Sequence, residues 1–179
     1  MNNSVQVSAT IPDWSREMPE RGEWQPGREL MRSLRGYQRA RTHGWFSSLF
    51  ISRLWVLAHR FWSAVAGTDI PINTEIGGGL AMPHPNGIVI HADAKIGPNC
   101  LLFQQVTLGG NEHGAPTLIG HVDVGAGAKI LGKVTIGAHA KIGANSVVLT
   151  DIPEGATAVG IPAKIILPKG DQKREKSEG

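Results

Sequence analysis

The apolar residues of the chain recur every six positions over most of its second half. From Ile90 the sequence divides into hexads that each begin with an aliphatic residue, as in "IHADAK", "IGPNCL", "VGAGAK" and "IGAHAK". Two inward positions in every six residues are typical of a short strand followed by a turn, and three such units form one coil of a parallel β-solenoid. We therefore expect an all-β solenoid. The fifth place of the hexads is small or β-branched, at Ala94, Cys100, Val106, Val122, Ala128, Val134, Ala140 and Ser146.

The hexads begin less regularly before Ile90. "IPINTE" and "IGGGLA" fit the pattern, whereas eight residues rather than six separate Met82 from Ile90, and the extra ones fall at "HPNG". Proline fixes its backbone dihedral and has no amide donor. We expect His84, between Pro83 and Pro85, to be held in a stiff turn that does not join the sheet ladder.

Helical periodicity precedes the solenoid. Apolar residues at helical spacing predict a first helix over roughly 28–41, and "WFSSLFISRLWVLAHRFWSAVAG" predicts a second that ends at Gly67, a favourable C-cap. We expect the apolar face of the second helix to pack on the first helix or on a neighbouring subunit, in preference to a membrane surface. That face comprises Phe50, Leu54, Leu57, Phe61 and Val65. The predicted organisation is a helical extension over 1–67, a solenoid domain over 68–168 and a solvated tail over 169–179.

Composition narrows the function classes further. The formal net charge is only +3 and much of the excess lies in arginines between residues 28 and 60, which does not indicate a nucleic-acid partner. A single cysteine, Cys100, excludes a disulfide or a cysteine metal cluster within one chain, and it fits a reducing cytoplasm. The N-terminus has no secretory signal pattern, and charged residues interrupt the apolar run over 45–67. We expect a cytoplasmic protein.

Two long stretches resemble a known enzyme family. "GTDIPINTEIGGGLAMPHPNGIVIHADAKIGPNCLLFQQVTLGG" and "VGAGAKILGKVTIGAHAKIGANSVVLTDIPEGATAVGIPAKII" are similar to the serine O-acetyltransferase branch of the left-handed parallel β-helix acyltransferases, over roughly 67–166. The resemblance implies a left-handed coil, which the general chirality rule would not favour. It also implies acetyl-CoA as co-substrate, no required metal, and a homotrimer with active sites between its subunits.

The same resemblance assigns a catalytic pair. In that branch a histidine in the turn matching "MPHPNG" is the general base, and an aspartate fifteen residues earlier pairs with it; these positions hold His84 and Asp69. Residues fifteen to eighteen apart lie on adjacent rungs near one corner of a solenoid, so a carboxylate there would fix the imidazole tautomer. A hydroxyl acceptor must lose its proton as it attacks a thioester, which suits histidine. Gln104 should return to this corner on the next rung, as a substrate contact.

The resemblance places acetyl-CoA in a groove between two subunits. The matching positions are Gly110, Ala126 and Lys141, with Lys164 as a further basic candidate near the adenine end. Small side chains let pantetheine approach the backbone, and a lysine can meet a phosphate. Cys100 occupies a small-residue corner of a hexad, and we expect its thiol to be packed and inert.

The sequence departs from the family pattern where the acceptor binds. Free serine requires countercharges for its ammonium and carboxylate groups. The branch carries an acidic residue before the histidine and an Arg-His pair before the proline that follows the loop, whereas Pro83 and Gly114-Ala115 stand here. We therefore favour a neutral hydroxyl on a sugar unit, as in glycan biosynthesis, with serine O-acetylation in cysteine biosynthesis as the alternative. Hydrogen bonds to the sugar would come from Gln104, Gln105, Asn111, Glu112 or His113.

Two other functions are less favoured. Left-handed β-helices also host zinc between subunits, as in gamma-class carbonic anhydrases, but the remaining histidines lack the close pair expected of that family. These are His91, His113, His121 and His139. An inert scaffold would make His84 a turn filler, and the proline-clamped histidine, its matched aspartate and the "VTLGG" loop argue against that reading.

Overall fold

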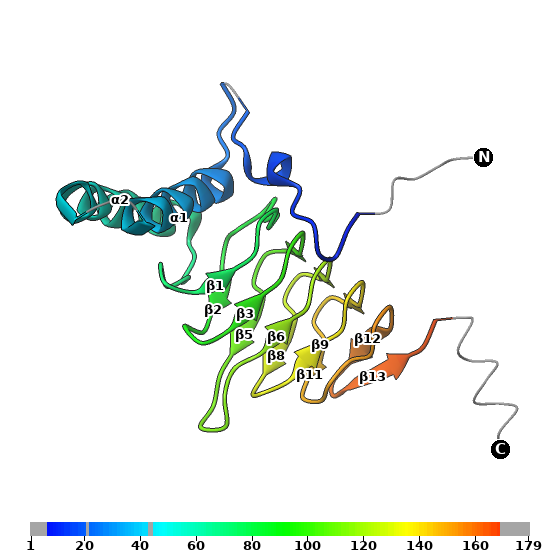
Figure 1. Ribbon diagram of the computed structural model, residues 1–179. Coiled ribbons are helices and arrows are strands. Elements are labelled where there is room, and N and C mark those ends of the chain that lie inside the picture. Colours follow the sequence, from blue (N-terminus) through cyan, green and yellow to red (C-terminus); the bar gives the residue numbers. More distant parts are fainter. Residues whose placement is uncertain (1–6, 21, 43–44, 169–179) are drawn as a thin grey trace, which may run out of the picture.

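The computed structural model describes residues 7–20, 22–42 and 45–168, which form a triangular β-solenoid beneath two helices (Figure 1). A short 3₁₀ helix, η1 (Trp14–Glu17), precedes α1 (Pro26–Thr42) and α2 (Trp45–Ala66). The predicted tail over 169–179 lies outside the described residues. The strands are β1 (Glu75–Ile76), β2 (Val89–Ile90), β3 (Lys95–Ile96), β4 (Leu101–Leu102), β5 (Thr107–Gly109), β6 (Thr117–Leu118), β7 (Asp123–Val124), β8 (Lys129–Leu131), β9 (Thr135–Ile136), β10 (Lys141–Ile142), β11 (Val147–Val148), β12 (Thr157–Gly160) and β13 (Ala163–Ile166).

The strands stack into three sheets that form the sides of the prism. Sheet 1 has the order β1-β3-β6-β9, sheet 2 the order β13-β12-β10-β7-β4, and sheet 3 the order β11-β8-β5-β2. Neighbouring strands are parallel throughout, except that β12 and β13 form an antiparallel hairpin at the far end from the helices. The fold class predicted from the hexads and the resemblance, a left-handed parallel β-helix with a short helical extension, is confirmed.

Strand register locates the two places where the coil is longer than three hexads. Val89 pairs with Thr107, eighteen residues later, whereas Asp69 pairs with Val89, twenty residues later. The two additional residues therefore fall in the turn that carries His84. Leu101 pairs with Asp123, twenty-two residues later, because the loop between β5 and β6 is also extended.

The solenoid interior is built from the two hexad positions that the sequence predicted. The leading aliphatic residues from Ile90 to Val148 are 0–3% exposed, and the small residues at the fifth place are 0–6% exposed. Burial of these side chains contributes most of the stabilisation of such a narrow fold, at about 25 cal/mol per Å² of apolar surface. Small residues suffice at the corners because two sides of the prism meet there and leave little interior space.

The second helix ends as predicted but turns the opposite face to the protein. Gly67 has φ +64°, and the amide of Thr68 donates to the carbonyl of Ser63 at 3.0 Å, a Schellman cap. The predicted apolar face does not pack on α1, because Gly36 of α1 lies against Trp55, on the other side of α2. Packing of that face on a neighbouring subunit, the other partner expected for it, stays a prediction. The predicted face is 38–75% exposed, at Phe50, Leu54, Leu57, Phe61 and Val65.

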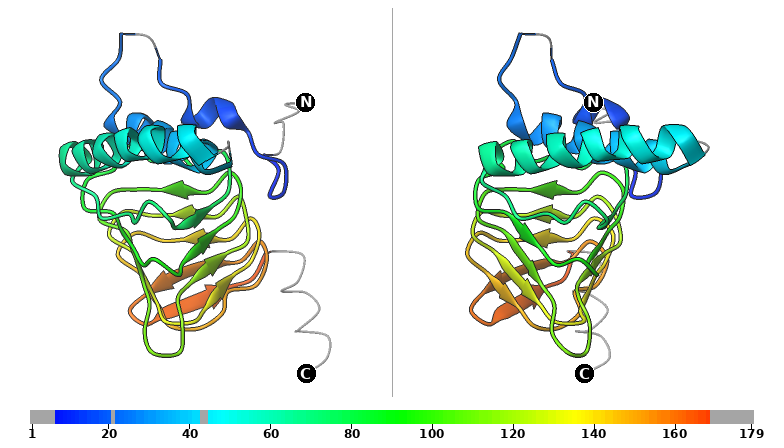
Figure 2. Two further views of the ribbon diagram at one scale, coloured as in Figure 1. Left: turned by 60° about the vertical axis from the view of Figure 1, so that its left-hand side comes forward. Right: turned by 90° about the vertical axis from the view of Figure 1, so that its left-hand side faces the viewer.

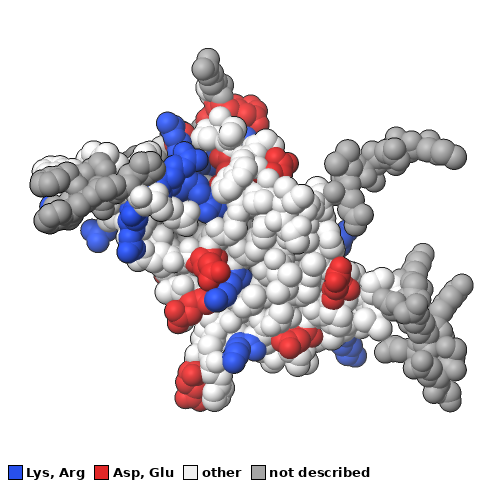
Figure 3. Space-filling view, viewed as in Figure 1, with Lys and Arg blue, Asp and Glu red and all other residues white. Residues whose placement is uncertain are grey.

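Positive charge gathers on α1, above the solenoid (Figure 3). The arginines there explain most of the basic balance seen in the sequence. Among the described helices, none is long and apolar enough to cross a membrane.

A buried ion pair fixes the helices onto the first coil. Arg35 of α1 donates from Nε and Nη2 to the carboxylate of Glu17 at 3.0 and 2.8 Å, and the two side chains are only 11% and 6% exposed. Arg35 also donates to the carbonyls of Ile76 and Gly77, while Glu17 Oε1 accepts from the amides of Gly79 and Leu80. The pair therefore satisfies backbone groups at the open edge of the first coil, which no strand covers.

The N-terminal segment before α1 lies along one edge of the prism, between sheets 1 and 2 (Figures 1 and 2). The Asn99 side chain holds it there. Its Nδ2 donates to the carbonyls of Ser8 and Ile11 at 2.7 and 2.8 Å, and its Oδ1 accepts from the amide of Asp13 at 2.7 Å.

A buried histidine between the helices and the solenoid should make the stability of the protein depend on pH. His59 is 6% exposed, its Nε2 donates to the carbonyl of Ile70 at 2.8 Å, and burial lowers its pKa more than this bond raises it. Below pH 6.5, the ordinary pKa of histidine, the unfolded chain therefore binds more protons at this residue than the folded chain does. The stability that is present above that pH is lost as the pH falls through the lowered pKa of the folded state. We expect the thermal midpoint to decline between about pH 7 and pH 5.

The variant His59→Gln should show a shallower decline over the same range, measured by circular dichroism. The thermal midpoint of the variant should still decline somewhat, because the pKa of His121 is also lowered, chiefly by burial. Equal slopes for the wild type and the variant would contradict the assignment to His59.

Candidate active site

His84 lies on the outside of the turn between sheets 2 and 3. Pro85 and Met82 are buried beneath it, while His84 and Pro83 are exposed. The turn is fastened from both sides, because the amide of Gly87 donates to the carbonyl of Gly67 at 2.7 Å and Gln105 donates to the carbonyl of Asn86 at 2.9 Å. A histidine on so fixed a backbone is oriented with little loss of entropy on binding a substrate.

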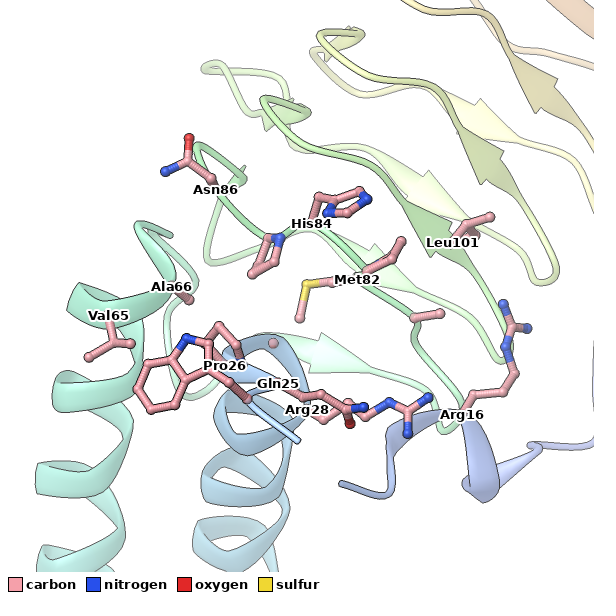
Figure 4. Close-up of a pocket in the computed structure, with 15 residues that line it drawn as sticks. Arg16, Gln25, Pro26, Arg28, Val65, Ala66, Met82, His84, Asn86 and Leu101 are labelled. Carbon is pink, nitrogen blue, oxygen red and sulfur yellow. The ribbon is translucent and has the colours of Figure 1, made fainter. Parts of the chain in front are cut away.

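His84 opens onto a pocket of about 650 Å³ at the junction of the helical part and the first coil (Figure 4). Its walls come from η1, the start of α1, the end of α2 and the turn at His84. In the view of Figure 4, Val65 and Ala66 lie at one end, Arg16 and Leu101 at the other, and Met82 and His84 between them. The volume is within the range of small-molecule sites.

Asp69 lies one rung before the turn of His84 but does not contact it. The amide of Asp69 donates to the carbonyl of Ile88 and its carbonyl accepts from Ile90, each at 2.9 Å, so the backbone stands at the start of sheet 3. Its exposed side chain lines a different depression, together with His59. In the described part of the chain no hydrogen bond or ion pair joins Asp69 to His84, and the catalytic pairing stays a prediction.

Gln104 and Gln105 lie at the same corner as His84, on the following rung. Ala81 pairs with Leu101, and this register carries Gln104 alongside the His84 turn. The amide oxygen of Gln104 is buried and has no hydrogen-bond partner among the described residues. Gln105 is exposed, and its carbonyl accepts from Lys129 Nζ at 2.6 Å.

Asn111 and His113 lie at another corner, between sheets 3 and 1. They belong to the loop between β5 and β6, which projects from the solenoid (Figure 2). The amide of Asn111 donates to the carbonyl of Gly114 at 2.8 Å, and its side chain accepts from the amide of His113 at 2.9 Å. One chain by itself therefore does not bring these two residues to His84.

Three of the four residues predicted to bind acetyl-CoA lie on sheet 2 or close to one of its strands. Ala126 comes two residues after β7, Lys141 lies on β10, and Lys164 lies on β13. In sheet 2, β10 lies beside β7, and β12 lies between β10 and β13. Gly110 does not share this face. It follows β5 at the corner of the projecting loop, where a Cβ would be 2.8 Å from the ring of His91.

Cys100 is fully buried, and burial raises the pKa of its thiol to about 11. A thiol that is protonated and inaccessible at neutral pH is no nucleophile.

The histidines contain a close pair that the sequence analysis denied. His121 and His139 lie on adjacent rungs of the corner between sheets 1 and 2, with their Nδ1 atoms 2.8 Å apart. Their eighteen-residue separation at equivalent hexad places was the available signal. Among the described residues, no third histidine, cysteine or acidic side chain joins them in a group that could hold a metal ion.

Sequence reasoning missed the part of the pocket that lies outside the hexads. Arg16, Trp24 and Arg28 line it together with His84. No periodic signal marks Arg16 or Trp24, because the segment before the first predicted helix has neither hexads nor a helical pattern, and Arg28 was predicted only as the start of that helix.

Comparisons with known proteins agree on one group of relatives. No family model matches the chain. The serine acetyltransferase of Helicobacter pylori strain J99 is 43% identical over 123 residues, which are 65% of this chain and 69% of that protein. The serine acetyltransferase of Synechococcus elongatus is 41% identical over 110 residues, and the match spans only 45% of its length. A solved serine acetyltransferase in complex with CoA is 36% identical with a TM-score of 0.67, covering 80% of this chain and 58% of the other.

Proposed function

The chain belongs to the serine acetyltransferase family, and on that premise we propose that it transfers the acetyl group of acetyl-CoA to the hydroxyl of L-serine. The relatives are serine acetyltransferases, which supports serine, the alternative acceptor of the sequence analysis. None of them supports the sugar hydroxyl that was favoured there.

The observation that carries the proposal is the exposure of His84 on a fastened turn at the mouth of the pocket. Its imidazole takes the proton of the serine hydroxyl while the oxygen attacks the thioester carbonyl carbon. The carbon–sulfur bond then breaks, and the thiolate of CoA takes up the proton from the imidazolium. The acetyl group passes directly to the acceptor, because the buried Cys100 offers no nucleophile for a covalent intermediate.

Asp69 and Gln104 have supporting roles in this proposal. Asp69 lies one rung before the turn of His84, and its carboxylate, once rotated toward that turn, would select the tautomer of His84 that accepts the substrate proton. The unpaired oxygen of Gln104 would accept a hydrogen bond from the acceptor or from the imidazole.

The separation of the remaining candidates favours a trimer with shared sites. Asn111 and His113 lie on a projecting loop at a different corner from His84, and Gly110 lies beside that loop. In the proposed homotrimer the loop of one subunit reaches the His84 corner of the next. Acetyl-CoA then lies between Gly110 of one chain and the face with Ala126, Lys141 and Lys164 of another.

An acceptor screen tests the function. Release of free thiol from acetyl-CoA should be fastest with L-serine and slower with nucleotide sugars and oligosaccharides, each corrected for hydrolysis without acceptor. Activity on a sugar that matches or exceeds the activity on serine would reject the proposed acceptor. Absence of thiol release with every acceptor would reject the proposed reaction.

A further inference from the structure

The proposed acceptor carries a carboxylate that the projecting loop cannot bind. The loop over 110–116 contains no arginine or lysine, and Pro83 stands directly before the candidate base. A carboxylate held in a pocket requires a cationic or strongly hydrogen-bonding partner, and the planar guanidinium group matches it best.

The pocket at His84 supplies cations from a different part of the chain. Its lining includes Arg16 and Arg28, and no aspartate or glutamate. Arg28 is already committed, since its Nη1 donates to the carbonyl of Met18 at 2.6 Å and to the carboxylate of Glu20 at 3.0 Å.

Arg16 is not paired with a carboxylate. The one hydrogen bond of its side chain to another described residue runs from Nη1 to the backbone carbonyl of Asn99, at 2.5 Å. The nearby carboxylate of Asp13 is occupied by Ser15, accepting from its amide at 3.1 Å and from its hydroxyl at 2.6 Å. A guanidinium has five N–H donors, so most of those on Arg16 are left for another acceptor.

The backbone beneath Arg16 is held firmly against the solenoid. Asn99 fastens the segment on one side of it and the buried Glu17 on the other. Only the side chain needs to turn for a ligand, and exchanging a neutral carbonyl for a carboxylate strengthens its hydrogen bond.

We propose that Arg16 binds the anionic group of the acceptor, which is the carboxylate in the case of L-serine. The proposal rests on the proposed function. It places acceptor recognition on the N-terminal segment, at the end of the pocket beyond Met82, while His84 receives the hydroxyl proton (Figure 4).

Steady-state kinetics separates anion binding from a structural role. With Arg16→Gln, we expect KM for L-serine to rise about 10- to 100-fold, the loss of one hydrogen-bonded charge pair, and KM for acetyl-CoA to stay unchanged. Arg16→Lys should recover part of the loss. L-serinamide, which lacks the carboxylate, should be used equally by the wild type and Arg16→Gln. Arg32→Gln is the matched control, because Arg32 is an exposed arginine outside this pocket.

Chemical modification gives a readout that does not depend on turnover. Phenylglyoxal modifies accessible guanidinium groups of the folded protein. Digestion and mass spectrometry of the peptides then report the modification at each arginine. L-serine should protect Arg16 and leave Arg32 as reactive as before, whereas L-serinamide should protect neither.

The outcomes distinguish the inference from the reaction it rests on. Serine turnover without protection of Arg16, or an equal effect of Arg16→Gln on serine and serinamide, would overturn the role of Arg16 and leave the reaction standing. Protection of Arg16 without turnover would support the anion site and reject the reaction. Loss of activity with serine and serinamide alike, together with a lowered thermal midpoint, would assign Arg16 a structural role and overturn the inference.

Discussion

Replacing His84 with alanine is expected to lower kcat/KM for the transfer of acetyl groups to serine by roughly 10²- to 10⁴-fold, the usual contribution of a general base. His84 is exposed on its turn, and no hydrogen bond from its ring to another described residue is present, so the substitution removes little stabilising contact. The measurement is thiol release from acetyl-CoA at saturating and limiting serine. The thermal midpoint of the variant should stay within a few degrees of the wild type.

His139→Ala is the matched control for this prediction. His139 also occupies a corner of the solenoid, but at the edge between sheets 1 and 2, where its ring contacts His121. Its removal should leave the transfer rate close to that of the wild type. Full activity of His84→Ala would mean that some other group accepts the hydroxyl proton, and the proposed chemistry would be lost.

Replacing Glu17 with glutamine is expected to lower the free energy of unfolding by about 3–5 kcal/mol, because it leaves Arg35 as an unpaired charge in a nearly buried position. The side-chain oxygen of the glutamine can still accept from the backbone amides of Gly79 and Leu80. It cannot replace the two charge-assisted hydrogen bonds that the carboxylate accepts from Arg35. Urea denaturation followed by circular dichroism measures the change.

Glu20→Gln provides the comparison. Its carboxylate pairs with Arg28 at 3.0 Å, but the two side chains are 60% and 32% exposed, and such surface pairs contribute about 0–1 kcal/mol. If the two variants lost equal stability, burial would not be the reason for the strength of the Glu17–Arg35 pair.

The solenoid was predictable from sequence because its determinants are local and repeated. Each coil needs an aliphatic residue and a small residue at fixed places, and a single misread hexad does not change the period. The turn at His84 was recognisable for a related reason, since two prolines and two extra residues interrupt an otherwise regular register.

Features that depend on how different elements meet were not predictable in the same way. The apolar stripe on α2 gave no sign that Gly36 would draw the opposite side of the helix against α1. The pair of His121 and His139 was predictable, by contrast, because residues eighteen apart at equivalent hexad places stack on adjacent rungs.

The acceptor illustrates the same limit. The loop lacks the arginine expected for serine, and from sequence this absence favoured a neutral sugar hydroxyl. In the folded chain Arg16 lines the same pocket as His84, although it lies more than sixty residues earlier in the sequence. No hexad or motif in the sequence indicates this placement. In the proposal made above, the countercharge for the carboxylate of serine comes from this N-terminal segment and not from the loop.

The way the first and last coils are closed has a consequence for solubility. A stack of parallel strands offers two open ends, and each is a template to which another chain could add in register and continue into a fibril. Here Glu17 and Arg35 occupy backbone groups of the first end with charged side chains, and at the other end the antiparallel strand β13 forms the edge of sheet 2. The first end and the edge of sheet 2 at the last end therefore both oppose the addition of another parallel strand in register.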